Sequence, residues 1–120
     1  VRIGDDTTFA SGSNRLSARA KDILDNVANV ITGIEGRVVV SGHTNDESLK
    51  GSSFTSNWEL SASRAATVVD FLVSAGKVES NRVMAQGFAN SRPLSEALTP
   101  AAKAANRRVE ILVTRSREAQ

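Results

Sequence analysis

The segment from Gly42 to Glu47 gathers the most reactive side chains of the sequence. It contains the histidine His43, the amide Asn45 and the carboxylates Asp46 and Glu47. A zinc site normally needs further histidine or cysteine ligands at suitable spacing, but the chain has one histidine and no cysteine. A hydrolase needs a nucleophile paired with a base and an oxyanion hole, and the sequence has no motif for them. We therefore expect neither a metal nor a catalytic site here, and composition alone indicates a solvated turn.

A cation on the helix that follows adds a second interpretation. The run from Ser56 to Glu59 fits a capping box, in which the serine hydroxyl and the glutamate carboxylate satisfy opposite backbone amides at a helix start. Arg64 lies eight residues after Ser56, just over two turns along, so its side chain can lean back toward residues 43 to 47. The amides of the helix start also favour a carboxylate ligand. A binding cleft and a simple ion pair of Arg64 with a neighbouring carboxylate both remain open.

The triplet Asn106-Arg107-Arg108 comes directly before the last expected strand. It admits two interpretations. Charged residues at a sheet edge protect it against aggregation. Alternatively, the two arginines form a second cationic wall of the cleft.

Apolar residues at three- and four-residue intervals predict helices, and short β-branched or alternating runs predict strands. Ser17 is the expected N-cap of the first helix and Gly33 marks its end. The apolar stripe of the second helix is expected to begin at Trp58, and that of the first helix to include Val30 and Ile34. In chain order we expect strand 1–4, helix 17–33, strand 37–42, helix 56–76, strand 82–88, a short helix or loop 100–105, and strand 108–114.

This order predicts an α/β (α+β) two-layer sandwich with a mixed four-stranded sheet. Crossover connections of helical length imply parallel neighbours among the early strands, while the shorter link before the last strand permits either direction. A chain of 120 residues that is 40% hydrophobic can bury one modest core, so we expect a single domain over residues 1–120.

The charge balance disfavours nucleic acid as a partner. Fifteen basic residues against thirteen acidic ones give a formal charge of +2, and the arginines are scattered. Four phenylalanines and one tryptophan offer little surface on which bases could stack. Arginine supplies eleven of the basic residues, and its planar fork suits carboxylates.

No apolar run reaches the roughly 20 residues that a membrane-spanning helix needs, and the start of the chain lacks the layout of a signal peptide. The chain begins without methionine, directly in an expected strand. We therefore expect a fragment whose export signal or membrane anchor lies upstream.

Together these residues resemble the OmpA-like peptidoglycan-binding family over nearly the whole chain. The matching motifs are Gly42-His43-Thr44, Asn57 with Leu60-Ser61 and Arg64-Ala65, and Asn106-Arg107-Arg108-Val109-Glu110. Within that family, the tryptophan after Asn57 and the segment Phe9–Ser13 resemble the C-terminal periplasmic domain of flagellar stator B subunits, the MotB and PomB type.

The resemblance implies a non-catalytic, cofactor-free domain that binds the diaminopimelate part of the peptidoglycan stem peptide. It also implies a homodimer in the periplasm, part of an inner-membrane-anchored protein that holds a flagellar stator against the cell wall. The stator A subunit would be contacted through the region N-terminal to this chain. The alternative is a wall anchor of another envelope protein, such as a porin tail, a lipoprotein or a secretion-system subunit.

One position departs from the family pattern. The aspartate that follows Gly-His-Thr is Asn45 here, with Asp46 next in sequence. An amide in place of the carboxylate loses a charge-assisted hydrogen bond to the ammonium group of the ligand, about tenfold in affinity. Arg64 is expected to hold the ligand carboxylate and Asn45 or Asp46 the ammonium group. The expected site comprises Thr44, Asn45, Asp46, Asn57, Leu60, Arg64, Arg107 and Arg108.

Overall fold

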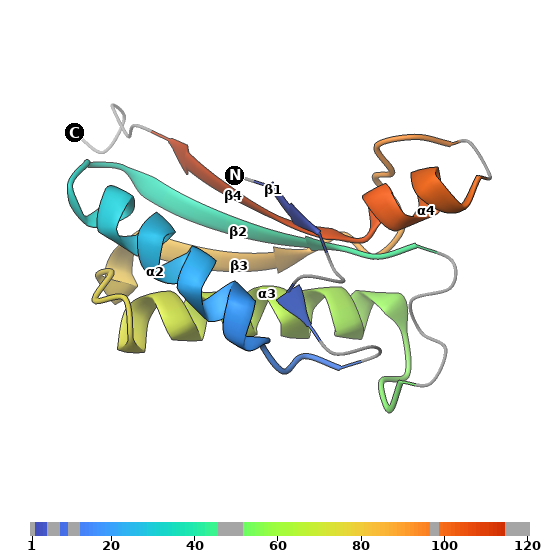
Figure 1. The fold of residues 1–120 in the computed structure, drawn as a ribbon, viewed down its shortest axis with the longest axis horizontal. Coiled ribbons are helices and arrows are strands. Elements are labelled where there is room, and N and C mark those ends of the chain that lie inside the picture. The colour runs from blue at the N-terminus through green and yellow to red at the C-terminus, as the bar shows by residue number, and fades with distance from the viewer. Residues whose placement is uncertain (1, 5–7, 10–12, 46–51, 97–98, 115–120) are drawn as a thin grey trace.

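The computed structural model describes residues 2–4, 8–9, 13–45, 52–96 and 99–114. The order of its elements confirms the predicted fold class (Figure 1). In chain order they are strand β1 (Arg2–Gly4), helix α2 (Ala18–Thr32), strand β2 (Arg37–His43), helix α3 (Asn57–Ser74), a 3₁₀ turn η1 (Ser80–Arg82), strand β3 (Val83–Gly87), helix α4 (Pro100–Asn106) and strand β4 (Arg108–Thr114).

The four strands form one mixed sheet in the order β1-β4-β2-β3. β2 and β3 are parallel neighbours, as the crossover through α3 predicts, and β4 runs antiparallel to both β1 and β2. The expectation of parallel neighbours is wrong for β1 and β2, because β4 lies between them. A crossover helix fixes the relative direction of two strands, but the last strand of the chain can still insert between them.

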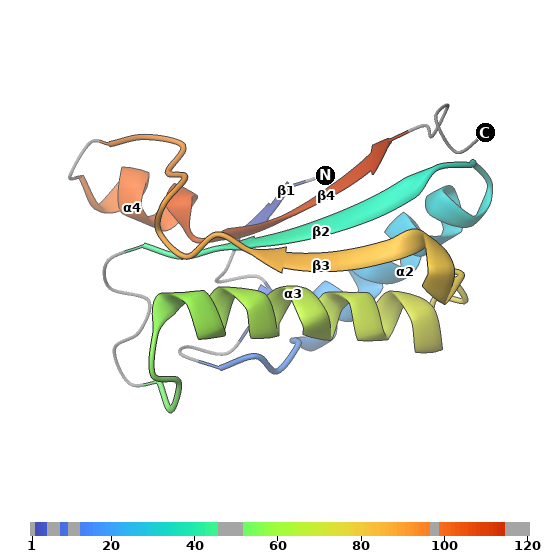
Figure 2. The same cartoon turned by 180° about the vertical axis from the view of Figure 1, so that it is seen from behind.

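Helices α2 and α3 cover the same face of the sheet, and α4 lies beyond the end of β2 on the other side (Figures 1 and 2). Strand alternation directs Val38 and Val40 of β2, together with Val109 and Ile111 of β4, toward the two helices. These side chains form one core with Leu24, Ile31, Val68 and Leu72 of the helices. The core therefore lies on one side of the sheet, between the sheet and the two long helices.

Local side-chain contacts fix the helix starts. The Ser17 hydroxyl accepts a hydrogen bond from the Ala20 amide, and the Ser56 hydroxyl accepts one from Glu59, as predicted. The other half of the capping box differs, because the Glu59 carboxylate accepts from the amide of Thr55, 2.9 Å away. The reciprocal bond is thus shifted one residue toward the preceding loop.

The prediction that Trp58 begins the buried stripe of α3 is wrong, because its exposed fraction is 56%. The buried face instead runs through Leu60, Ser61, Arg64, Ala65, Val68 and Leu72. The sheet backbone approaches α3 most closely at Gly42 and Gly87, where an added Cβ would collide with residues 61 and 62. Small residues on the helix match these glycines, so the bulky tryptophan points outward.

Two apolar residues assigned to the buried stripe of α2 are also exposed. Val30 is 65% exposed and Ile34 45%. Both line a small apolar pocket between α2 and β4, with a volume of about 250 Å³. Within the described ranges, no helix combines the length and the hydropathy needed to cross a membrane.

Candidate binding site at the end of the sheet

The end of β2 and the first turns of α3 are fastened together through Ala89. The Ala89 amide donates to the Ser61 hydroxyl at 3.0 Å, and its carbonyl accepts from the Thr44 amide at 2.8 Å. Gly42 contacts the Ser61 backbone directly, with no room for a Cβ atom. This arrangement fixes where the chain leaving β2 passes the start of α3.

Two predicted site residues carry buried oxygen atoms without a hydrogen-bond partner, Thr44 through Oγ1 and Asn57 through Oδ1. Thr44 is 2% exposed. Asn57 lies one turn before Ser61, and Thr44 lies two residues beyond Gly42. Because β2 and α3 run in opposite directions (Figure 1), both residues lie toward the same end of the molecule. Buried polar atoms are nearly always paired, so these two oxygens are exceptions among the described residues.

Asn45 is buried and directed toward α4. Its Nδ2 donates to the carbonyl oxygen of Lys103 at 2.8 Å. An aspartate could not donate this bond, which gives a physical reason for asparagine at this position. Asp46 lies outside the described residues, so the choice between Asn45 and Asp46 as acceptor for an ammonium group stays a prediction.

Arg64 is almost completely buried, with 3% of its surface exposed. Its Nε donates to the carbonyl oxygen of Ser13 at 2.8 Å, and its guanidinium carbon lies 4.8 Å from the centre of the Phe9 ring. The N-terminal segment therefore contributes directly to the surroundings of this arginine. The predicted position of Arg64 opposite residues 43 to 47 remains a prediction.

Phe9 and Ser13 were absent from the residues expected at the site. The only signal in the sequence was the resemblance of the segment Phe9–Ser13 to stator B subunits, which assigned no role to either residue. Their contacts with Arg64 span about fifty positions of the sequence, beyond the reach of any local pattern.

The two arginines of the Asn-Arg-Arg motif have different surroundings. Arg108 is buried, and its three guanidinium nitrogens bond to the Glu110 carboxylate and to the carbonyl oxygens of Asn106 and Arg92, at 2.6 to 3.0 Å. Arg107 is half-buried and forms the C-cap of α4, one residue before β4 begins. Strand alternation directs Val109 to the α3 side of the sheet and Arg108 to the other side.

Leu60 is fully buried in the first turns of α3, next to Ser61. Its apolar side chain offers no polar group to a ligand. Its predicted place in the site can therefore rest only on packing.

His43 lies on the sheet face opposite α3. It is buried, stacks on Phe88 with ring centres 5.2 Å apart, and neither ring nitrogen has a hydrogen-bond partner. Burial, then the charge of Arg108, lowers the pKa of His43 to about 4. The ring is therefore neutral at physiological pH, with the Glu110 carboxylate 3.8 Å from Nε2.

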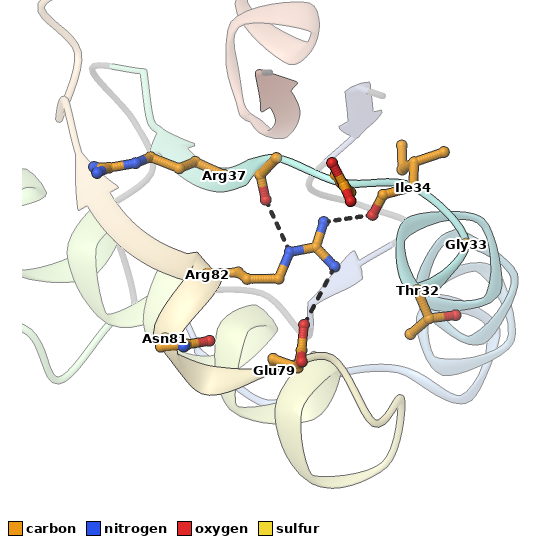
Figure 3. A pocket seen from close by; sticks show the side chains of 9 residues that line it. Thr32, Gly33, Ile34, Arg37, Glu79, Asn81 and Arg82 are labelled. Carbon is orange, nitrogen blue, oxygen red and sulfur yellow. Dashed lines mark hydrogen bonds and ion pairs between the residues drawn. The ribbon is translucent and has the colours of Figure 1, made fainter. Parts of the chain in front are cut away.

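A polar pocket of about 430 Å³, drawn in Figure 3, is lined by the end of α2, the start of β2 and the turn before β3, at the end of the sheet opposite Thr44. Arg82 occupies its centre and donates to the carbonyl oxygens of Gly36, Ile34 and Ile31. These bonds tie β3 to the end of α2 and the turn after it. Arg82 thus has a structural role, remote from the unpaired oxygens of Thr44 and Asn57. No cluster of three or more potential metal-ligating side chains occurs among the residues that the structure describes.

Comparison with known proteins identifies the family of the chain. The OmpA family model matches residues 8–107. The protein YtxE of Bacillus subtilis is 33% identical over 109 residues, which make up 91% of this chain and 45% of that protein. Motility protein B of Escherichia coli K12 is 38% identical over 108 residues, 88% of this chain and 34% of that protein.

A solved structure, the cell wall anchor of the T6SS from Pseudomonas aeruginosa, aligns with a TM-score of 0.87 and 30% identity, covering 96% of this chain and 80% of that one. The chain spans less than half the length of YtxE and of the Escherichia coli protein. The family model covers the motifs from Gly42 to Arg107, including both residues with unpaired oxygens. The chain therefore belongs to the OmpA family of peptidoglycan-binding domains.

Proposed function

We propose that this domain binds peptidoglycan without cleaving it, through the diaminopimelate part of the stem peptide. Peptidoglycan-binding domains of the OmpA family are non-catalytic. The observation that carries the proposal is the pair of buried, unpaired oxygens of Thr44 and Asn57 at the end of the sheet. An unpaired buried polar atom costs about 1–3 kcal/mol, and a ligand that supplies donors removes that cost.

The chemistry of the site suits a zwitterionic amino-acid headgroup. Thr44 Oγ1 and Asn57 Oδ1 can accept hydrogen bonds from an ammonium group, with Asn45 or Asp46 as further acceptor. Arg64 supplies positive charge for the carboxylate, with Arg107 as a further cation of the proposed site. Because Arg64 is 3% exposed, a ligand carboxylate reaches its guanidinium only when covering residues other than Phe9 and Ser13 move aside.

The test is a pull-down with purified sacculi, followed by titration with a diaminopimelate-containing peptide. Thr44→Val removes the unpaired hydroxyl and keeps the shape of the side chain. We expect it to leave the melting temperature unchanged or higher, because a buried unpaired group is lost, and to weaken binding about tenfold. The matched control is Thr67→Val on α3, whose hydroxyl is bonded to the Ser63 carbonyl, and its binding should equal that of the wild type.

The outcomes distinguish an error in the proposed ligand from an error in the proposed site. A wild-type domain that sacculi do not retain would refute peptidoglycan binding. Wild-type affinity in Thr44→Val would instead remove this oxygen from the site. Arg64→Ala should abolish retention, and full retention would exclude the arginine as carboxylate partner.

We further propose that this wall binding anchors a flagellar stator. The similarity to Motility protein B of Escherichia coli supports this role. The proposal includes a homodimer in the periplasm, an inner-membrane anchor N-terminal to this chain, and the stator A subunit as partner. The check is a chimera in which this chain replaces the matching region of that protein. Restored swimming supports the stator role, and immobile cells whose chimera still binds sacculi would refute it.

A secretion-system wall anchor is the second candidate, because the T6SS anchor of Pseudomonas aeruginosa aligns with the whole domain at a TM-score of 0.87. In that case the same site would bind the cell wall and anchor a secretion system instead of a stator. A failed stator chimera, together with function in a matching T6SS anchor chimera, would favour this candidate.

A further inference from the structure

We infer that Phe9 and the backbone carbonyl of Ser13 are positioning elements that orient the Arg64 guanidinium for the ligand carboxylate. The inference rests on the proposed function and adds the N-terminal segment to the site. Two contacts carry it: the Phe9 ring lies 4.8 Å from the guanidinium carbon, and the Ser13 oxygen lies 2.8 Å from Nε.

These contacts constrain the guanidinium in two independent ways. A ring within about 6 Å of a cation attracts it, which holds the guanidinium over the Phe9 face. The Ser13 carbonyl oxygen accepts a hydrogen bond from Nε, and this bond fixes the rotation of the guanidinium within its own plane. Bidentate recognition of a carboxylate requires both the plane and the rotation to be correct. A long, flexible arginine side chain would otherwise lose entropy when it forms that geometry.

The segment that carries Phe9 and Ser13 is itself held at several points. Phe9 pairs with Leu16 in a β-bridge, and the Ser17 amide donates to the Thr8 carbonyl at 2.9 Å. Asn14 Nδ2 donates to the Ser63 hydroxyl at 2.7 Å, next to Arg64 in sequence. Thr8 and Phe9 are thus held to the start of α2, and Asn14 to Ser63 of α3, so the residues on either side of the arginine contacts have a fixed geometry.

Phe9 is 5% exposed and also belongs to the core, so a pure packing role is the competing explanation. Phe9→Leu keeps an apolar side chain and removes the ring face, whereas Phe9→Tyr keeps the ring. Phe71→Leu on α3 is the matched control, because Phe71 packs against the same core. Among the described residues, the phenylalanines that stack on an arginine are Phe9 and Phe88, and Phe71 is not one of them.

The experiment titrates each variant with a diaminopimelate-containing peptide and with the same peptide carrying a carboxamide in place of the headgroup carboxylate. We expect Phe9→Leu to weaken binding of the carboxylate peptide about tenfold and of the carboxamide peptide much less. Phe9→Tyr and Phe71→Leu should bind the carboxylate peptide like the wild type. In an Arg64→Lys background, Phe9→Leu should add little further loss, since the planar group it positions is gone.

Failure of the inference can be told from failure of the proposed function. If the wild type binds, Arg64→Ala does not, and Phe9→Leu binds like the wild type, the positioning role is refuted while peptidoglycan binding stands. Equal losses in Phe9→Leu and Phe71→Leu refute it in favour of packing. A wild type that binds neither sacculi nor peptide refutes the proposed function itself.

A measurement on the wild type covers the case in which Phe9→Leu does not fold. The Arg64 Nε hydrogen should exchange slowly with solvent and show a ring-shifted NMR resonance, because it bonds to Ser13 beside the Phe9 ring. A fast-exchanging, unshifted Nε resonance would overturn the inference.

Discussion

Gly42 of β2 lies against the backbone of Ser61 in α3, so close that a Cβ atom at position 42 would overlap the Ser61 carbonyl oxygen. The contact sets the spacing between the sheet and the helix beside the candidate site. Thr44 follows Gly42 by two residues, and Asn57 precedes Ser61 by about one helical turn. The positions of their unpaired oxygens therefore depend on the absence of a side chain at position 42.

Gly42→Ala should therefore lower both stability and ligand binding. A methyl group forced against helix backbone displaces the strand or the helix, and such overpacking costs roughly 1–3 kcal/mol. Urea denaturation measures the free energy of unfolding, and the sacculus pull-down measures binding. Gly4→Ala is the control, since nothing lies within 4 Å of its added Cβ. Equal stability of the two variants would contradict the close contact.

Asn45→Asp should change stability and binding in opposite directions. The substitution removes the Nδ2 donor to the Lys103 carbonyl and sets a carboxylate oxygen against a carbonyl oxygen. We expect a loss of about 1–3 kcal/mol in unfolding free energy, with faster hydrogen exchange in α4.

If Asn45 also accepts from the ligand ammonium group, the restored charge should strengthen peptide binding about tenfold. Asn26→Asp makes the same change at an exposed position of α2 and should leave stability within about 0.5 kcal/mol. Unaltered exchange in α4 of Asn45→Asp would show that the bond to Lys103 does not hold that helix.

The stability of the domain should fall between pH 7 and pH 5 because of His43. Its pKa is lowered to about 4 in the folded protein, first by burial and then by Arg108. The unfolded chain, with the ordinary histidine value of about 6.5, takes up a proton in this range that the folded protein does not. Stability is thus complete above about pH 6.5 and decreases toward pH 4, by about 2 kcal/mol between pH 7 and pH 5.

His43→Phe isolates this effect, because the chain has no other histidine. Burial raises the pKa of Glu110, but its hydrogen bond from Arg108 and the nearby charges outweigh burial and leave the pKa below its usual range. Glu110 therefore stays ionised in the folded protein from pH 7 to pH 5, and since an unfolded glutamate takes up few protons above pH 5 it adds little slope there. Urea denaturation of His43→Phe should give nearly the same free energy of unfolding at pH 7 and at pH 5. An equally small difference in the wild type would contradict the lowered pKa of His43.

Arg82→Met should destabilise the end of the sheet remote from the binding site. The guanidinium holds the carbonyl oxygens of Gly36 and Ile34 at 2.8 and 2.9 Å and a third, that of Ile31, at 3.3 Å (Figure 3). Leaving these partly buried acceptors unpaired costs on the order of 2 kcal/mol in unfolding free energy. Arg37→Met is the control, an exposed arginine lining the same pocket. Sacculus binding should be unchanged in both, and a stable Arg82→Met protein would refute the structural role.

Much of the local structure is predictable from the sequence. Ser17, Ser56 and Gly33 mark helix ends because capping depends on hydrogen bonds between residues three or four positions apart. The motifs around Thr44, Asn57 and Arg107 likewise indicate the family. Strand direction between β2 and β3 follows from the length of the helical crossover.

Tertiary structure decided the remaining features. Four features have no local signal: the insertion of β4 between β1 and β2, the outward position of Trp58, the burial of Arg108 with three hydrogen-bond partners, and the contact of Arg64 with Phe9 and Ser13. Each depends on which surfaces meet when the sheet packs against the helices. Local hydrogen bonds are encoded within a few residues, whereas side-chain environments depend on contacts between segments that only folding brings together.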